Sequence, residues 1–190
     1  ACFSLLDNDT VIASPEVSVN FPNGEIEFLE DSFPPSRAYL KLWEFFTVYR
    51  VRPTAGERCI DLGACPGGWT WVLSELGCKV ISVDKAPLDA KLLKRKNIEV
   101  KKHDAFTLKP EDVGPVDWLF SDVICEPKRL LELVHQWRSA DMAKNFVCTI
   151  KFKGKTDHAI IREFLKLEGS RARHLYVNKH EITWWLTSSR

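Results

Sequence analysis

Residues 58–76 read RCIDLGACPGGWTWVLSEL: an apolar strand-like stretch, a glycine-rich loop and a second apolar stretch that we predict as a helix. A strand that turns through glycines into a helix is typical of nucleotide-binding α/β sheets, because glycines let the backbone approach a ligand closely. The loop lacks the dinucleotide pattern GxGxxG, since Cys65 stands where a glycine is needed and Pro66 precedes the pair Gly67-Gly68. The sequence therefore predicts a nucleotide-type site without a pyrophosphate cradle, which disfavours a dehydrogenase.

Strand and helix signals alternate outward from this loop. A helix is predicted to open at Pro34-Pro35-Ser36 and to carry apolar residues at helical spacing as far as Tyr49. The predicted strands are 58–64, 79–84, 98–103, 116–121, 145–151, 172–177 and 181–187, and the remaining predicted helices are 69–76, 88–95, 127–138 and 156–167. This order predicts an α/β fold of the Rossmann-like kind, a doubly wound and mostly parallel seven-stranded sheet that binds its ligand outside the carboxyl ends of the strands.

The first residues differ from this pattern. Two short apolar stretches, residues 3–6 and 11–13, flank the turn-forming Asp7-Asn8-Asp9 and predict a β-hairpin. We therefore expect residues 1–33 to form an N-terminal β segment, the remnant of an upstream domain, and residues 34–190 to form the main domain.

Composition excludes several classes of protein. The chain has 190 residues, a net charge of +1 and 28% charged residues, and its apolar runs are too short for a membrane span. The six cysteines and five histidines show no metal-ligand spacing, so we expect reduced thiols, no metal and a cytoplasmic protein. Because the whole chain is not basic, any contact with nucleic acid must be local.

Acidic residues lie at or near the carboxyl ends of four predicted strands: Asp61, Asp84, Asp104 and Asp122. Asp84 lies 21 residues beyond Gly63, where a carboxylate can accept hydrogen bonds from both hydroxyls of an adenosine ribose, and Asp104 is placed to meet the adenine. Each aspartate taken alone is better explained as a helix cap or a turn former. Four of them at successive strand ends indicate a ligand crevice.

The stretch Asp-Leu-Gly-Ala-Cys-Pro-Gly-Gly-Trp at 61–69 resembles the cofactor motif of the FtsJ-type ribose 2′-O-methyltransferases. Within that family the likeness extends over about residues 34 to 187 to the RlmM-like group, which acts on bacterial 23S ribosomal RNA. It rests on Pro35-Ser36-Arg37, Lys41-Leu42, Ser82-Val83-Asp84, Ser121-Asp122, Glu126-Pro127, Gln136-Trp137, Lys151 and Glu181. One departure is Ala38, where that group carries a serine, and this puts at most one cofactor contact in doubt.

The resemblance implies S-adenosylmethionine as the cofactor and a Lys-Asp-Lys-Glu tetrad at Lys41, Asp122, Lys151 and Glu181. The expected cofactor-binding residues are Asp61, Gly63, Ala64, Cys65, Pro66, Gly67, Gly68, Trp69, Asp84, Asp104 and Asp122. Lys151 would accept the proton of a ribose hydroxyl, which it can do only while uncharged, and the like charges of Lys41 and the sulfonium favour that form. Asp122 and Glu181 would orient the two lysines and the hydroxyl.

The expected partner is single-stranded or locally opened ribosomal RNA, with no membrane and no obligatory protein partner. Lys153, Lys155, Arg171 and Arg173 are the candidates for phosphate contacts, because they lie near the catalytic strands in the sequence. Two alternatives stay open: an RNA-binding scaffold that keeps the fold without catalysis, and a methyltransferase for a cap-like ribose or a small molecule. Without the family pattern, Lys41, Lys151 and Glu181 would each be explained better as structural residues.

Overall fold

The computed structural model of the chain describes residues 1–17, 21 and 26–188. Its main sheet has seven strands in the order β5-β4-β3-β6-β7-β9-β8. These strands are β3 (Arg58–Leu62), β4 (Lys79–Asp84), β5 (Ile98–Lys102), β6 (Val116–Ser121), β7 (Ala143–Lys151), β8 (Ser170–Arg173) and β9 (Glu181–Leu186). The pairs from β5 to β7 are parallel, and β9 pairs antiparallel with both β7 and β8. The predicted doubly wound, mostly parallel seven-stranded sheet is confirmed.

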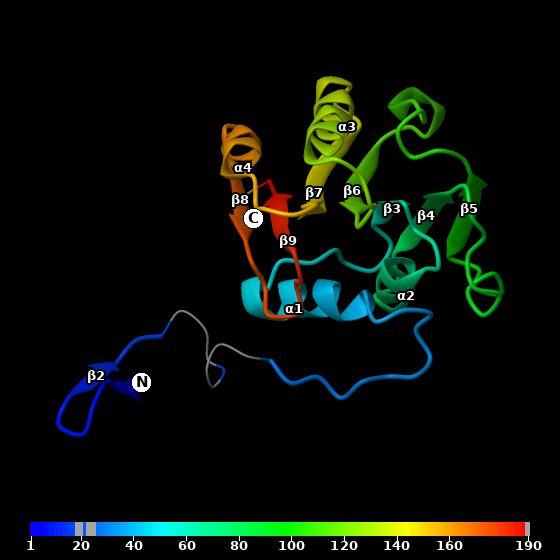
Figure 1. Cartoon of the computed structure of the whole chain (residues 1–190). Coiled ribbons are helices and arrows are strands. Elements are labelled where there is room, and N and C mark those ends of the chain that lie inside the picture. The colour runs from blue at the N-terminus through cyan, green and yellow to red at the C-terminus, as the bar shows by residue number, and fades with distance from the viewer. Residues whose placement is uncertain (18–20, 22–25, 189–190) are drawn as a thin grey trace.

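Helices cover both faces of this sheet (Figure 1). One face carries α1 (Tyr39–Tyr49) and α2 (Gly68–Glu75), and the other carries α3 (Pro127–Ser139) and α4 (His158–Leu165). Successive residues of a strand point to opposite faces, so Trp185 packs with α1 and α2 while Trp184 packs with α3 and α4. Burial on both faces explains why the central strands are almost continuously apolar.

The connection between β4 and β5 corrects a prediction, because residues 88–95 form a series of turns and not a helix. Asp89 donates its backbone N–H to the carbonyl of Pro66, and the turns then close by bonds to the third residue back, from Leu92 to Asp89 and from Arg95 to Leu92. Leu88 and Leu92 are buried by this path. Their apolar spacing, which suggested a helix, reflects contact with the glycine loop.

The strand predicted at 172–177 is also shorter and begins earlier than expected, since β8 ends at Arg173. The backbone N–H groups of Tyr176 and Val177 bond to the carboxylate of Glu44 in α1 and not to a neighbouring strand. A buried side chain from a distant part of the sequence therefore replaces the strand ladder at this point.

The predicted N-terminal hairpin is present as β1 (Cys2–Leu5) and β2 (Val11–Ser14), which pair antiparallel. All eight strand residues are exposed, and Figure 1 draws the hairpin apart from the main sheet. Farther along, Ile26 is buried and Asp31 donates its backbone N–H to the hydroxyl of Tyr39, so part of the predicted N-terminal segment already lies against α1. The division at residues 33 and 34 stays a prediction. Among the described residues, no helix has the length and apolar character needed to cross a membrane.

Candidate active site

The glycine loop joins β3 to α2 at the carboxyl edge of the sheet. Gly63 and Ala64 donate backbone N–H groups to the carbonyl of Val83, and Cys65 donates its N–H to the carboxylate of Asp84 at 3.0 Å. Gly63 has a φ of 80°, and a Cβ added there would lie 2.6 Å from the Cβ of Val123. Glycine is therefore required at this position by both conformation and space.

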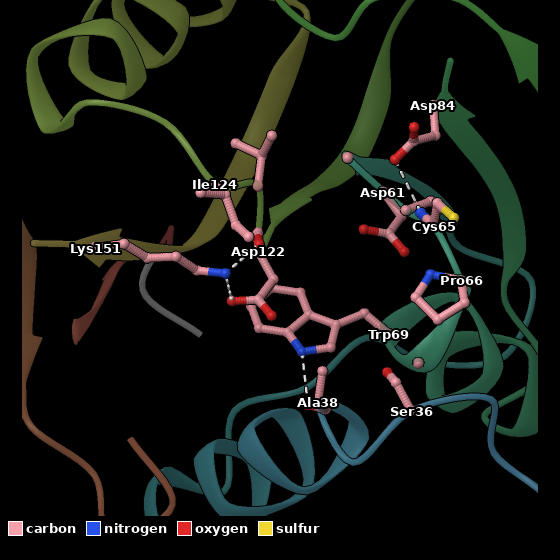
Figure 2. Close-up of a pocket in the computed structure, with 14 residues that line it drawn as sticks. Ser36, Ala38, Asp61, Cys65, Pro66, Trp69, Asp84, Asp122, Ile124 and Lys151 are labelled. Atoms are coloured by element: carbon pink, nitrogen blue, oxygen red, sulfur yellow. Dashed lines mark hydrogen bonds and ion pairs between the residues drawn. The ribbon is translucent and has the colours of Figure 1, made fainter. Parts of the chain in front are cut away.

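A cavity of about 430 Å³ lies along this loop (Figure 2). Nine of the eleven predicted cofactor-binding residues line it, namely Asp61, Gly63, Ala64, Cys65, Pro66, Gly68, Trp69, Asp84 and Asp122. Gly67 and Asp104 are not part of the lining: a Cβ on Gly67 would meet the buried side chain of Leu92, and Asp104 forms an ion pair with Lys85 at 3.1 Å. The volume lies within the usual range for a small-molecule site.

Trp69 closes one side of the cavity at the start of α2. Its indole N–H donates to the backbone carbonyl of Ala38 at 2.9 Å, which ties α2 to the residues that precede α1 (Figure 2). Ser36 also lines the cavity, and a Cβ on Gly68 would lie 2.5 Å from its hydroxyl oxygen. A hydroxyl therefore lies close to Ala38, although the serine expected at that position is missing.

Asp61 lies at the floor of the cavity and is only 1% exposed. Its carboxylate accepts a hydrogen bond from the Thr70 hydroxyl at 2.7 Å, and that hydroxyl also contacts the hydroxyl of Ser82 at 2.8 Å. Burial raises the pKa of Asp61 to about 7, and the negative charges of Asp122 and Asp84 add to the rise. The hydrogen bond from Thr70 acts in the opposite direction.

Four charged side chains meet beside this cavity: Lys41, Asp122, Lys151 and Glu181. The Nζ atom of Lys41 lies 3.1 Å from Asp122 and 2.6 Å from Glu181. The Nζ atom of Lys151 lies 3.1 Å from the Asp122 carboxylate and 4.0 Å from the Glu181 carboxylate. The side chains are between 8% and 19% exposed, and two positive charges offset two negative ones, which is the condition for keeping such groups away from water.

Each of these residues comes from a different element. Lys41 is in the first turn of α1, Asp122 follows β6, Lys151 ends β7 and Glu181 begins β9. Lys151 and Glu181 are direct partners in the antiparallel ladder, and Lys151 also donates to the backbone carbonyl of Asp122 at 2.6 Å (Figure 2). The structure thus brings the four predicted residues into one cluster, while their catalytic roles stay a prediction.

Sequence reasoning missed two residues that contact the cluster, Thr149 and Asn178, and a third, Glu44, that holds the turn before β9. Thr149 donates its hydroxyl to the Asp122 carboxylate, and Asn178 contacts Glu181 at 3.5 Å. Thr149 lies two positions before Lys151 on the same strand, so period-two alternation could have placed both on one face of the sheet. No comparable local signal exists for Glu44, whose partners lie more than 130 residues away.

The predicted phosphate-contacting residues Lys153, Lys155, Arg171 and Arg173 are all exposed. Lys153 and Lys155 follow β7, Arg171 and Arg173 lie on the edge strand β8, and none of the four lines the cavity. Among the described residues there is no group of three or more histidine, cysteine, aspartate or glutamate side chains able to hold a metal ion.

Comparison with known proteins gives a family match over most of the chain. Residues 34–177 match the family described as FtsJ-like methyltransferase. The chain is 36% identical over 159 residues to Ribosomal RNA large subunit methyltransferase M of Halorhodospira halophila, covering 78% of the chain and 46% of that protein. It is 33% identical over 172 residues to the protein of that name in Thauera aminoaromatica, covering 82% of the chain and 47% of that protein. The chain thus spans about half the length of the curated relatives it matches.

Solved structures share the fold at much lower sequence identity. Fibrillarin of Aeropyrum pernix in complex with S-adenosyl-L-methionine superposes with a TM-score of 0.58 at 18% identity, covering 78% of this chain and 75% of fibrillarin. This likeness supports the sheet order described above and is limited to the fold.

Proposed function

The chain belongs to the FtsJ-like methyltransferase family, and on that premise we propose that it methylates a ribose 2′-hydroxyl of ribosomal RNA, in the large-subunit 23S RNA, with S-adenosylmethionine as the methyl donor. The observation that carries the proposal is the contact between Lys41, Asp122, Lys151 and Glu181 beside the glycine-loop cavity. A reaction that moves one proton and aligns one oxygen with a methyl group needs such a group of positioned amines and carboxylates.

The cavity suits S-adenosylmethionine better than a dinucleotide. Gly63 and Gly68 pack so closely against Val123 and Ser36 that a Cβ on either would collide, and this packing holds the loop backbone along the cavity. Asp84 ends β4, and its carboxylate oxygens retain acceptor capacity for two ribose hydroxyls beyond their bonds to Cys65 and Ala86. When bound, the cofactor supplies a methyl group on a positively charged sulfonium, which is a good leaving group.

In the proposed reaction, Lys151 would accept at its Nζ atom the proton of the 2′-hydroxyl, whose oxygen would replace the cofactor sulfur on the methyl carbon. Lys151 is held in place by the backbone carbonyl and the carboxylate of Asp122. The Nζ atom of Lys41 lies 3.1 Å from the same carboxylate, so Asp122 lies between the two amines and positions both. Glu181 bonds Lys41 and faces Lys151, so it fixes the separation of the two amines.

Methyl transfer to RNA tests this function directly. RNA from cells in which the gene has been deleted is incubated with the protein and labelled S-adenosylmethionine, and the modified nucleotide is mapped. We expect one labelled ribose in 23S RNA. Lys151→Ala and Lys151→Arg should lose at least about 100-fold in kcat, because alanine has no amine and the arginine guanidinium stays protonated and cannot accept a proton. Lys144→Ala, a change of an exposed lysine on the same strand, serves as the control.

Three outcomes would contradict the proposal. A methyl group on a base would change the reaction type, and full activity in Lys151→Ala would remove the proton acceptor. RNA binding without transfer would favour the scaffold alternative. Binding of S-adenosylhomocysteine but not NAD in a calorimetric titration separates the cofactor classes.

A further inference from the structure

Next to the cavity of the glycine loop, which we name the cofactor cavity, a second cavity of about 820 Å³ borders the charged cluster. We call it the acceptor cavity. Lys41 and Glu181 line it, whereas Asp122 and Lys151 line the cofactor cavity, and Ala38 borders both. The charged cluster and Ala38 therefore lie where the two cavities border each other, and a substrate in the acceptor cavity would reach the cluster next to the cofactor cavity.

The walls of the acceptor cavity are aromatic and aliphatic. Tyr176, which is 59% exposed, forms part of the wall together with Phe28, Leu40 and Val177. An exposed ring beside an apolar surface is a suitable platform for a planar ligand, because stacking replaces water on both faces. A nucleic-acid base is such a ligand.

The loop that carries Tyr176 is held rigidly from α1. Glu44, which is 2% exposed, accepts hydrogen bonds from the backbone N–H groups of Tyr176 at 2.6 Å and Val177 at 2.8 Å. In the same turn, the Asn178 side chain accepts from the backbone N–H of Leu175 and contacts Glu181 at 3.5 Å. Glu44 and Lys41 lie one turn apart on α1, so one helix positions both the charged cluster and the wall of the acceptor cavity.

Charges on the lining of the acceptor cavity balance. Three acidic residues, Glu27, Glu30 and Glu181, face three basic ones, Arg37, Lys41 and Lys179. Arg37 and Glu30 pair at 2.6 Å, and Lys41 is paired within the cluster. A site for phosphate groups would carry an excess of positive charge. The balance instead suits the uncharged part of a nucleotide, its base and sugar.

We propose that the acceptor cavity binds the nucleoside whose 2′-hydroxyl is methylated, with Tyr176 stacking on its base and Glu44 acting as a positioning residue for Tyr176. This rests on the proposed function. It implies that the target nucleotide is unpaired when it reacts, because a base in a duplex cannot lie against Tyr176.

Steady-state kinetics with the mapped RNA fragment test the role of Tyr176. We expect Tyr176→Ala to raise KM for RNA by about 5- to 100-fold, the usual effect of losing one base stack. Tyr176→Phe should stay close to the parent protein, and the dissociation constant of S-adenosylhomocysteine should not change in either variant. Phe3→Ala removes an exposed aromatic ring from the distant hairpin and is the matched control. An unchanged KM in Tyr176→Ala would overturn the proposal.

Glu44→Gln tests the positioning role, because an amide can accept only one of the two N–H bonds well and places its own N–H groups against the other. We expect KM for RNA to rise about 3- to 10-fold with kcat and cofactor affinity retained. A higher KM accompanied by losses of kcat and of cofactor affinity and by a lower melting temperature would indicate a merely structural role and would contradict the assignment.

Photo-crosslinking gives a readout that does not depend on turnover. RNA with 4-thiouridine at the target position should crosslink to the peptide that contains residues 174–179, and Tyr176→Ala should reduce the yield. If the parent protein methylates a ribose but crosslinks elsewhere, this inference alone fails. If it methylates no ribose, the proposed function fails with it.

Discussion

Asp122 is the residue on which most of the site depends. Its carboxylate is shared by Lys41, Lys151 and the hydroxyl of Thr149, and its backbone carbonyl accepts a further bond from Lys151. A carboxylate between two amines needs all its donors in place, because a small rotation would favour one lysine over the other. Thr149 is the neutral donor of the set and therefore the one that can be removed without changing the charge.

We expect Thr149→Val to lower kcat by about 10-fold, equivalent to about 1.4 kcal/mol, because Asp122 loses a hydrogen bond while the shape of the side chain is kept. Cofactor affinity and melting temperature should change little. Thr149→Ser restores the hydroxyl and should recover most of the rate. Parent-like kcat in Thr149→Val would show that Asp122 is oriented by the lysines alone.

Asp61 makes stability depend on pH. Its folded-state pKa of about 7 lies above the ordinary value of 3.8, so between these values the folded protein holds a proton that the unfolded chain has lost. Stability from this group is fully present below about pH 4 and falls as pH rises to about 7, by an amount on the order of 4 kcal/mol.

Asp61→Asn should remove this dependence. The free energy of unfolding is measured by urea denaturation at pH 4.5 and pH 8. The value for the variant minus that for the parent should be larger at pH 8, because only the parent loses stability as Asp61 ionises. Asp112→Asn, a change at an exposed carboxylate, is the control. An equal difference at the two pH values would show that Asp61 is ionised in the folded protein.

At the scale of the element, the sequence predicted strands and helices correctly where its apolar residues followed one clear pattern, either a continuous apolar run or helical spacing. The strands around the glycine loop are apolar throughout, and α3 buries the stripe Leu130, Leu133, Val134 and Trp137 that its spacing predicts. The errors at 88–95 and 174–177 have one cause. In both places, backbone N–H groups that would bond within a helix or a strand ladder bond instead to a distant acceptor. The acceptors are the carbonyl of Pro66 at 88–95 and the carboxylate of Glu44 at 174–177.

The site residues divide in the same way between those that local sequence predicts and those that distant contacts bring together. The glycine loop could be recognised locally, and the four charged residues were found through a family pattern and not through spacing, since their elements are far apart in the chain. Alternation along β7 could have placed Thr149, whereas Asn178 and the whole acceptor cavity depend on packing between α1, β9 and the turn before β9, which sequence periodicity does not contain.

Helix α4 offers a test of an element that stabilises the fold without touching the site. Asp157 caps it by accepting the backbone N–H groups of Ala159 and Ile160. We expect Asp157→Ala to lower the free energy of unfolding by about 1 kcal/mol, while Asp157→Ser should keep most of it. Methyl transfer at 25 °C should be unaffected. A loss of activity that Asp157→Ser does not restore would mean that the β7–α4 connection takes part in binding RNA.

At the scale of the whole molecule, a net charge of +1 limits how RNA can be held. If the exposed residues Lys153, Lys155, Arg171 and Arg173 bind phosphates, replacing all four by glutamine should weaken RNA binding and flatten its salt dependence. The slope of log K against log salt should fall by about 0.7 for each phosphate of single-stranded RNA that is no longer neutralised. Lys94→Gln with Lys96→Gln, exposed lysines before β5, should leave the slope unchanged. An unchanged slope in the fourfold variant would place the RNA path elsewhere.

Reversal of a single strand has an evolutionary consequence. Because β9 runs antiparallel to β7, its first residue, and not its last, arrives at the reactive edge, and Glu181 meets Lys151 directly across the ladder. The exposed side chains of the turn that precedes β9, such as Tyr176, can then change while the ladder holds that pair. A changed side chain at this connection would then alter which nucleotide the proposed acceptor cavity takes, while the Lys151–Glu181 pair stays in place.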